Sequence, residues 1–329
     1  MPESEVLERV KQLSAFDRLC HWMKERYAVY QRRENGQAKP WTLDSILQSF
    51  RFCNVYRELD RTTRWIAGNW RTPHDGDRDL WFALVVARWT NWIPTLQAIG
   101  YPIPWDRQRF IDVLTARQEA GQTAFGPVYT IRPPAGSESL PLSVAIAERT
   151  LDPLWRDRSY FAHVTEATLQ DAARAFGEYQ GMSPFMAGQV VADLKYCTRM
   201  RKAKDWWVWA AMGPGSQRGL NRLLGYGVNT PISDSEFREQ IGALQAKLAL
   251  VLRMVGMPRM HAQDTQCCLC EWDKHERVLW AEGRPKFRYE AWVGEPPEVP
   301  PVVAWRPELF GGPGRESELI GVYQTEAVS

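Results

Sequence analysis

Acidic side chains recur at helical spacing in residues 261–278, where the sequence is HAQDTQCCLCEWDKHERV. On a helix, Asp264, Glu271 and Lys274 would share one face, because residues three, four or seven positions apart lie above one another. Carboxylates one or two turns apart can act as a general base and the group that orients it. We therefore predict that Asp264, Glu271 and Asp273 are catalytic. The alternative is an intrahelical ladder of ion pairs between glutamate and lysine or histidine.

Arginine recurs with the same kind of spacing in residues 50–66. As a helix, this stretch would place four polar side chains on one face: Asn54, Arg57, Arg61 and Arg64. Three arginines on one face repel each other unless anions lie between or opposite them. Because a guanidinium fork matches phosphate oxygens, the face is a candidate phosphate or pyrophosphate clamp. The alternative is a solvated face on which Glu58 and Asp60 are the partners of the arginines.

A Gly-Pro-Gly turn at residues 213–215 follows a basic, tryptophan-rich run at 195–209. A glycine turn that leads into a helix directs backbone N–H groups at an anion. With cationic side chains beside it, such a turn can hold a DNA backbone without reading the base sequence, as helix–hairpin–helix modules do. The candidate DNA-binding residues of this region are Arg199, Arg201, Lys202, Gly213, Gly215, Gln217 and Arg218.

Two further charged features adjoin these blocks. Residues 282–289 (EGRPKFRY) interleave basic and aromatic side chains, and we expect Arg284 and Lys286 to contact a phosphate chain; a charged surface loop is the alternative. Asp193 precedes the basic run, where a salt-bridge role is favoured over a catalytic one. Most of the 16 tryptophans are expected in the core rather than stacked on bases.

The six cysteines do not predict a metal site. Cys267, Cys268 and Cys270 cluster in a helix-like stretch without the second, distant pair that zinc needs. The acidic, polar start is unlike a signal peptide, so free thiols in a reduced, cytoplasmic setting are expected. No apolar run approaches the ~20 residues that span a bilayer, so no membrane partner is expected.

The chain has 329 residues, 44% of them apolar, and a net charge of +2, which allows a sizeable core and argues against a histone-like binder. Helical periodicity predicts a mostly α fold with a short irregular or β insertion, whose only strand candidate is near 128–131. The expected helical regions are 4–33, 41–66, 79–99 (kinked or broken near Pro94), 106–121, one from 143, 165–180, 183–201, those flanking 213–215, 233–256 and 263–280.

Three blocks in this order resemble one protein family. They are NVYRELDR at 54–61, GPGSQRGLNR at 213–222, and LCEWDKHER at 269–277 with GRPK at 283–286. The family is that of α-glutamyl/putrescinyl thymine pyrophosphorylases, or amino acid:DNA transferases, with which phages hypermodify thymine. The blocks are also similar to the helical domain of 5-hydroxymethyluracil DNA kinases. Both groups look like distant relatives of helix–hairpin–helix DNA glycosylases, and the resemblance spans roughly 45–290.

The resemblance implies an enzyme that acts on phage double-stranded DNA carrying a modified uracil. An amine or amino acid would displace pyrophosphate from the 5-methylene group of an extruded base, leaving the glycosidic bond intact. Cations would stabilise the departing pyrophosphate and a carboxylate would take the amine proton. The residues assigned to pyrophosphate or substrate binding are Asn54, Arg57, Asp60, Arg61, Lys274 and Arg277. The resemblance fixes no cofactor, and Mg²⁺ is a candidate to bridge the pyrophosphate, because carboxylates and phosphate suit it.

The sequence contains no GxxxxGK[ST] motif, which favours the transferase over a kinase. Two alternatives stay open: a non-catalytic DNA-binding helical module of a 5-hydroxymethyluracil kinase system, and a glycosylase-like enzyme that removes a modified base. The expected organisation is a helical extension (1–40), a glycosylase-like catalytic domain (41–290), which could be two lobes with the active site between them, and a Pro/Gly-rich tail (291–329). The spare arginines weakly favour glycine or another amino acid as the amine.

Overall fold

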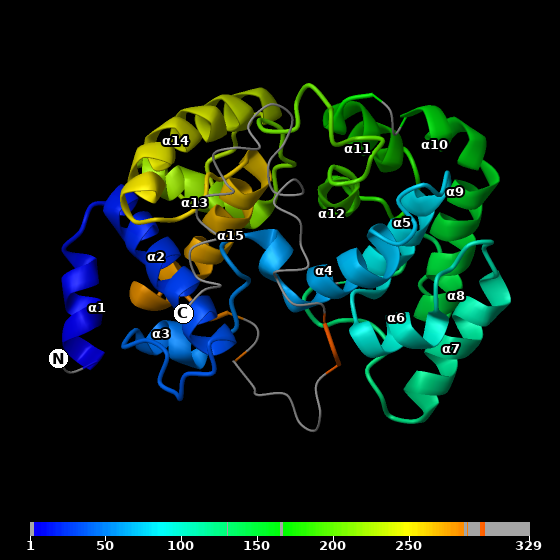
Figure 1. Cartoon of the computed structure of the whole chain (residues 1–329), viewed down its shortest axis with the longest axis horizontal. Helices are drawn as coiled ribbons and strands as arrows, with labels where there is room; N and C mark the ends of the chain where they lie inside the picture. The colour runs from blue at the N-terminus through cyan, green and yellow to red at the C-terminus, as the bar shows by residue number, and fades with distance from the viewer. Residues whose placement is uncertain (1–2, 130, 165–166, 286–287, 289–296, 300–329) are drawn as a thin grey trace, which may run out of the picture. The chain divides into compact units, whose positions relative to one another are not determined.

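The computed structural model describes residues 3–129, 131–164, 167–285, 288 and 297–299 (Figure 1). These residues form helices and connecting loops, and the described part of the chain contains no strand. Its one β-type pairing is an isolated antiparallel bridge between Phe50 and Arg288. The predicted mostly α class is therefore confirmed. The predicted strand near 128–131 is wrong for the described residues there, which form a turn.

The described residues divide into two compact units. Unit 1 contains 3–60, 210–285 and Arg288, and unit 2 contains the described residues of 61–209 with 297–299. The described residues of 3–40 belong to unit 1, and the predicted organisation into a helical extension, a catalytic domain and a tail stays a prediction. The elements of unit 1 are α1 (Glu3–Lys11), α2 (Ala15–Glu34), α3 (Ser45–Ser49), the 3-10 turn η1 (Arg57–Leu59), α13 (Pro214–Leu224), α14 (Asp234–Met254) and α15 (Ala262–Leu279).

Unit 2 is built from shorter helices, several of them joined end to end. They are α4 (Arg61–Ile66) with the π-helical turn η2 (Ala67–Arg71), α5 (Leu80–Thr90), α6 (Ile93–Ile99), α7 (Arg107–Glu119), α8 (Leu142–Ile146) with the π-helical turn η3 (Ala147–Leu151), α9 (Asp152–Arg156), α10 (Arg158–Val164), α11 (Leu169–Gly177) and α12 (Pro184–Leu194).

Helix α15 lies at the centre of unit 1, in contact with α2, α3, α13 and α14. Its side chains Leu269 and Trp272 are fully buried, as are Trp22 of α2 and Phe237 of α14. Polar anchors add to this burial. Glu276 accepts hydrogen bonds from Arg18 of α2, and His275 pairs with Asp44 at 2.8 Å. A helix with partners on all sides can position side chains accurately.

Two glycines allow α13 to approach α15 closely. A Cβ atom at Gly215 would lie 2.4 Å from the sulfur of Cys270, and one at Gly219 would lie 2.3 Å from the carbonyl oxygen of Leu269. Gly219 is required because its neighbour is backbone that cannot move by itself, whereas a Cβ atom at Gly215 would force the Cys270 side chain to rotate away. The GPGSQRG sequence thus has a packing function within unit 1, because it sets the distance at which Arg218 and Arg222 of α13 face α15.

The core of unit 2 is aromatic. All residues of α5 are buried, and Trp81 stacks on Phe161, which stacks in turn on Phe176. Trp206 is also buried and covers the fully buried Lys195. The largest fully buried side chains include Trp22, Trp81, Trp206 and Trp272, as the expected core role of tryptophan requires.

Local signals divide several of the expected helices. Ser14 caps α2 through a hydrogen bond from the Asp17 amide and separates it from α1. Asn91 adopts a left-handed conformation at φ 45° and ends α5, so the chain breaks just before the predicted position at Pro94. The region predicted as 183–201 is helical only to Leu194 and continues as turns.

Candidate functional site

In unit 1, residues 52–60 lie along α15 without forming the helix predicted for them. Glu271 accepts a hydrogen bond from the Cys53 amide at 2.9 Å, and Asp264 accepts one from the Arg57 amide at 3.0 Å. Since the two acids are seven residues apart on α15, they hold two points of the segment at one helix face.

The hydrogen bonds of this segment explain why it is not helical. Asp60 accepts from the Asn54 amide at 2.8 Å, and the Asn54 side chain donates to the carbonyl of Leu59 at 2.9 Å. Side chains therefore satisfy the backbone groups that a helix would pair internally. The predicted arginine face is wrong. The alternative of a solvated face is also wrong, because Glu58 and Arg64 are buried.

The Asp60 side chain is half-buried, and the pKa of its carboxyl group is shifted. Burial raises the pKa of its carboxyl group above the ordinary value of 3.8, against the opposing effects of the Asn54 amide, Arg26 and Arg57. A carboxyl group whose pKa is raised towards neutrality is suited to accept and release a proton. Asp60 was expected to bind substrate, and its geometry makes it a candidate proton acceptor as well.

Arg26 of α2 is a site residue that sequence analysis missed. It is 7% exposed and donates to the carbonyl of Phe52 at 3.2 Å, while its Nη1 atom has no hydrogen-bond partner among the described residues. Burial lowers its pKa, against the charge of Asp60. Asn54 Oδ1 is likewise buried without a partner in the described chain. Arg26 lies outside the resembling blocks and within an ordinary amphipathic helix, so no sequence signal identified it.

Glu271 also pairs with Lys274, whose ammonium group lies 2.5 Å from the carboxylate. Burial alone would lower the pKa of Lys274, but Glu271 raises it, so the lysine is charged at neutral pH. Asp273 contacts Arg277 one turn away at 3.4 Å. The interpretation of this block as an intrahelical ladder between glutamate and lysine or histidine is therefore confirmed for the Glu271–Lys274 pair, whereas Asp273–Arg277 is a pair that it did not include. The same carboxylates additionally bind other elements, which periodicity could not show.

Asp273 lies on the other side of α15, towards α13, and is fully buried. Its oxygens accept from Arg218 Nε at 2.9 Å and Arg222 Nε at 3.0 Å. Arg222 also pairs with Glu282. The structure thus brings together Arg218 and Arg277, which were assigned to different ligands, and adds Arg222. An acid enclosed by three guanidinium groups holds them in place and is poorly placed to accept a substrate proton.

Several hydrogen-bonding groups at the start of α13 already have partners within the chain. The Gly213 amide donates to Ser216 Oγ at 3.0 Å, and Gly213 has an extended backbone, at φ −128°, that any residue could adopt. The Gln217 side chain donates to the carbonyl of Thr230 at 2.8 Å. Gly215 packs on Cys270, as described above. The DNA-binding role of these residues stays a prediction.

The remaining basic candidates are not all in unit 1. Arg199, Arg201 and Lys202 belong to unit 2, where Arg199 donates to the carbonyl of Ala162 at 2.9 Å and the other two are exposed. Arg61 is exposed in the same unit and donates to the carbonyl of Pro297. Arg284 is exposed in unit 1, and Lys286 lies outside the described residues.

Asp193 has the structural role that was favoured for it. It is fully buried in unit 2, with Arg88 Nε at 2.5 Å and Arg71 Nη1 at 3.9 Å. Arg88 also donates to Thr63 at 3.1 Å. A carboxylate enclosed in this way stabilises the unit rather than reacting.

The cysteines are all described and none forms a disulfide. A hydrogen bond with Cys53 and burial raise the pKa of Cys267, and burial raises that of Cys270 to about 12, so these thiols are protonated at neutral pH. No group of three or more His, Cys, Asp or Glu side chains in the described residues could hold a metal ion. Within the same residues, no helix is long and apolar enough to cross a bilayer.

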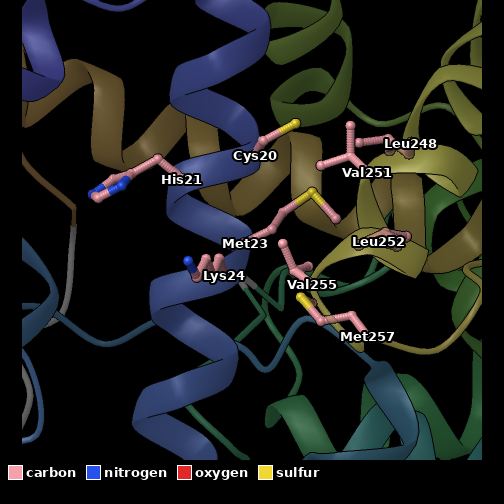
Figure 2. A pocket seen from close by; sticks show the side chains of 9 residues that line it. All are labelled: Cys20, His21, Met23, Lys24, Leu248, Val251, Leu252, Val255 and Met257. Atoms are coloured by element: carbon pink, nitrogen blue, oxygen red, sulfur yellow. The ribbon is translucent and has the colours of Figure 1, made fainter.

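A separate apolar hollow of about 130 Å³ lies between α2 and the C-terminal part of α14 (Figure 2). Met23, Leu248 and Met257 line it, and Cys20 lies at its edge. Burial raises the pKa of Cys20 to about 11. None of the carboxylates that hold residues 52–60 lines this hollow.

Comparisons with known proteins identify the family of this helical chain. The family model described as 5-hmdU DNA kinase, helical domain, matches residues 13–284, so the chain belongs to that family of helical domains. The chain is 26% identical over 223 residues to a protein named 5-hmdU DNA kinase from Bacillus phage SP10. The match covers 61% of this chain and 34% of that protein, so the chain spans about a third of the relative's length. No solved structure matches the chain.

Proposed function

We propose that this chain is a DNA base-modifying transferase, in which an amine displaces pyrophosphate from 5-pyrophosphoryloxymethyl-uracil in double-stranded DNA. The family of 5-hmdU DNA kinase helical domains supports DNA with a modified uracil as the substrate class. The observation that carries the proposal is the half-buried Asp60 carboxyl with its raised pKa, beside Arg26 and Arg57 and next to the segment held by Glu271.

The proposed reaction balances as a substitution. The amine nitrogen forms a bond to the methylene carbon, and the bond between that carbon and the pyrophosphate oxygen breaks. Pyrophosphate leaves with the bonding electron pair, and the nitrogen loses one proton to a carboxylate, which returns it to water. Asp60 is the acceptor that its acidity favours. Asp264 and Glu271 keep the segment in position, because each accepts a backbone amide.

Cations near the leaving group would lower the barrier, because the negative charge on pyrophosphate grows as the bond breaks. Arg26, with its unpartnered Nη1, and the charged Lys274 are the candidates in unit 1 that the contacts favour. Arg57 and Arg277 of unit 1 stay candidates for the same role, and the assignment of Arg61, which belongs to unit 2, stays a prediction from the sequence.

A specific observation favours a second candidate, a non-catalytic DNA-binding helical module of a 5-hydroxymethyluracil kinase system. The three acids first predicted to be catalytic all have partners within unit 1: Asp264 and Glu271 bind backbone amides, and Asp273 binds three arginines. Under this hypothesis the same residues serve only to shape a surface for DNA.

One experiment separates the candidates. The protein is incubated with DNA that carries pyrophosphorylated 5-hydroxymethyluracil and with a pool of amino acids and polyamines. The DNA is then digested to nucleosides for mass spectrometry. A new amino-nucleoside, absent with Asp60→Asn, is expected. Unchanged nucleosides together with DNA binding would favour the binding module, and released free base would indicate a glycosylase.

A further inference from the structure

We propose that Arg218 and Arg277, fixed by Asp273, form a single binding site for phosphate groups, supplied either by the DNA backbone or by free pyrophosphate. This inference deepens the proposed function and rests on it for the identity of the anion. It joins residues of α13 and α15 that the sequence had assigned to different ligands, and it gives Asp273 a positioning role.

The two arginines converge on one atom. Asp273 Oδ2 lies 2.9 Å from Arg218 Nε and 3.4 Å from Arg277 Nε, so the two cationic groups must be neighbours. Arg222 occupies the other carboxylate oxygen. Two carboxylates, Asp273 and Glu282, therefore face three guanidinium groups. Glu282 pairs directly with Arg222 and interacts with the charge of Arg277 at longer range, so the cluster keeps an excess of positive charge. Adjacent guanidinium groups repel each other, and an anion that binds both relieves the repulsion.

The partly exposed Arg218 and Arg277 have hydrogen-bond donors that no described residue uses. The side chains of Arg218 and Arg277 are 30% and 28% exposed, and their Nη atoms donate no hydrogen bond to any described residue. Arg277 Nε is buried without a hydrogen bond in the described chain, since its approach to Asp273 is poorly aligned. Arg222 differs, because its side chain is 8% exposed and both of its Nη atoms bind Glu282. Arg222 thus links α13 to Asp273 and Glu282, and Arg218 and Arg277 form the phosphate-binding site.

Asp273 acts through these arginines rather than on the ligand. It is fully buried, it accepts a hydrogen bond from Arg218 Nε and it forms an ion pair with Arg277, and these contacts leave the Nη donors of both arginines for a second partner. A guanidinium fork held in one orientation binds phosphate oxygens in pairs, whereas a mobile one loses conformational entropy on binding. The close packing of α13 on α15 at Gly215 and Gly219 keeps the two forks together.

The test uses the full chain, with inorganic pyrophosphate and a short unmodified DNA duplex as separate probes. Arg218→Gln and Arg277→Gln are each compared with Arg253→Gln, which removes the same charge from an exposed position on α14 of the same unit. We expect each site variant to weaken binding of at least one probe by about ten-fold, as the loss of a charge-assisted hydrogen bond requires. Circular dichroism and thermal unfolding establish that each variant is folded.

The two probes distinguish the sources of phosphate. If the site variants bind pyrophosphate more weakly but bind the duplex normally, the site holds the leaving group. If they bind the duplex more weakly and with a shallower salt dependence, the site holds the DNA backbone. Binding of both probes equal to that of Arg253→Gln overturns the proposal. Because no amine or modified base is present, a failure of the transferase hypothesis leaves this result unaffected.

Asp273→Asn tests the positioning role by the sign of its effect. The substitution makes the cluster more positive, so an acid that serves only as a counter-charge predicts tighter pyrophosphate binding in the folded variant. Weaker binding is the expected result if Asp273 orients the forks. Arg218→Lys and Arg277→Lys, which keep the charge and remove the fork, should weaken binding in the same way. Unchanged binding in both lysine variants would contradict a fork-based site.

Discussion

Asp60 and Glu271 both lie where residues 52–60 contact helix α15, but their environments give them different roles. Glu271 pairs with Lys274 and accepts a hydrogen bond from the Cys53 amide, so its oxygens hold neighbouring groups in place. For Asp60, burial outweighs the neighbouring arginines, and the pKa rises. An acid used for structure and an acid available for proton transfer can therefore be told apart by their contacts, although both belong to the blocks that the sequence had singled out.

The acidity of Asp60 predicts a pH-dependent stability. A carboxyl group with a raised folded-state pKa stabilises the fold fully below the ordinary value of 3.8, and this contribution is lost as the pH rises through the folded value. Asp60→Asn removes the titration. We expect its free energy of unfolding, relative to wild type, to increase from pH 4 towards neutrality in urea melts. A constant difference across that range would contradict the raised pKa.

Glu271→Ala should destabilise unit 1 by about 2–4 kcal/mol, because it leaves the Cys53 amide and the half-buried Lys274 without their partner. Glu271→Gln should cost less, since its amide oxygen can still accept from Cys53. Urea denaturation measures both, and Glu239→Ala, at an exposed position of α14, is the control. Equal costs for the two Glu271 variants would show that the backbone contact contributes little.

At the scale of elements, helix α15 organises unit 1 through three faces. One face holds residues 52–60, another packs on α13 and binds its arginines, and a third pairs with α2 and with Asp44. The glycines of α13 and the acids of α15 act together, because the arginines reach Asp273 only at the close helix separation that glycine permits.

Gly219→Ala tests this separation. Its Cβ would lie 2.3 Å from a backbone oxygen, which cannot move without shifting a helix, so we expect a loss of about 1–3 kcal/mol. Gly242→Ala is a matched control on α14, where a Cβ meets nothing within 4 Å and should stabilise the helix by about 0.5–1 kcal/mol. Thermal unfolding compares them. Equal effects would mean that α13 tolerates a wider separation.

Asp44 connects α3 to α15, and its contribution to the free energy of unfolding should depend on pH in the opposite direction from that of Asp60. Burial alone would raise the pKa of Asp44, but the bond to His275 and the amides of Leu47 and Ile46 lower it. A depressed pKa stabilises the fold above the unfolded value, and the contribution is lost as the pH falls through the folded value. Asp44→Ala should cost about 2 kcal/mol at neutral pH in chemical denaturation. The cost should shrink as the pH falls below about 4.

At the scale of the whole molecule, the two units depend on different stabilising features. Unit 1 is organised around a polar central helix, whereas unit 2 has an aromatic core with one enclosed carboxylate, Asp193. The basic, tryptophan-rich run and the Gly-Pro-Gly turn are adjacent in sequence, yet they belong to different units.

Asp193→Ala should therefore affect unit 2 selectively. Removing it leaves the buried Arg88 without its carboxylate, and we expect a destabilisation of about 3–5 kcal/mol. Hydrogen exchange followed by mass spectrometry should show lost protection in peptides from 61–209 and less change in those from 210–285. Asp112→Ala, at an exposed position of α7, is the control. Equal loss of protection in both ranges would mean that the units unfold together.

The sequence by itself determined the helical class, the extent of α15, the core role of most of the described tryptophans and the resemblance to the helical domains of 5-hydroxymethyluracil DNA kinases. These features follow from periodicity and composition, which are local. Tertiary structure decided that residues 52–60 form no α-helix, that Asp273 binds arginines of two helices, and that Arg26 lies against residues 52–60. Each of these features depends on hydrogen bonds or close packing between residues distant in sequence. The spacing of residues along the chain predicts local structure only, so it cannot predict such contacts.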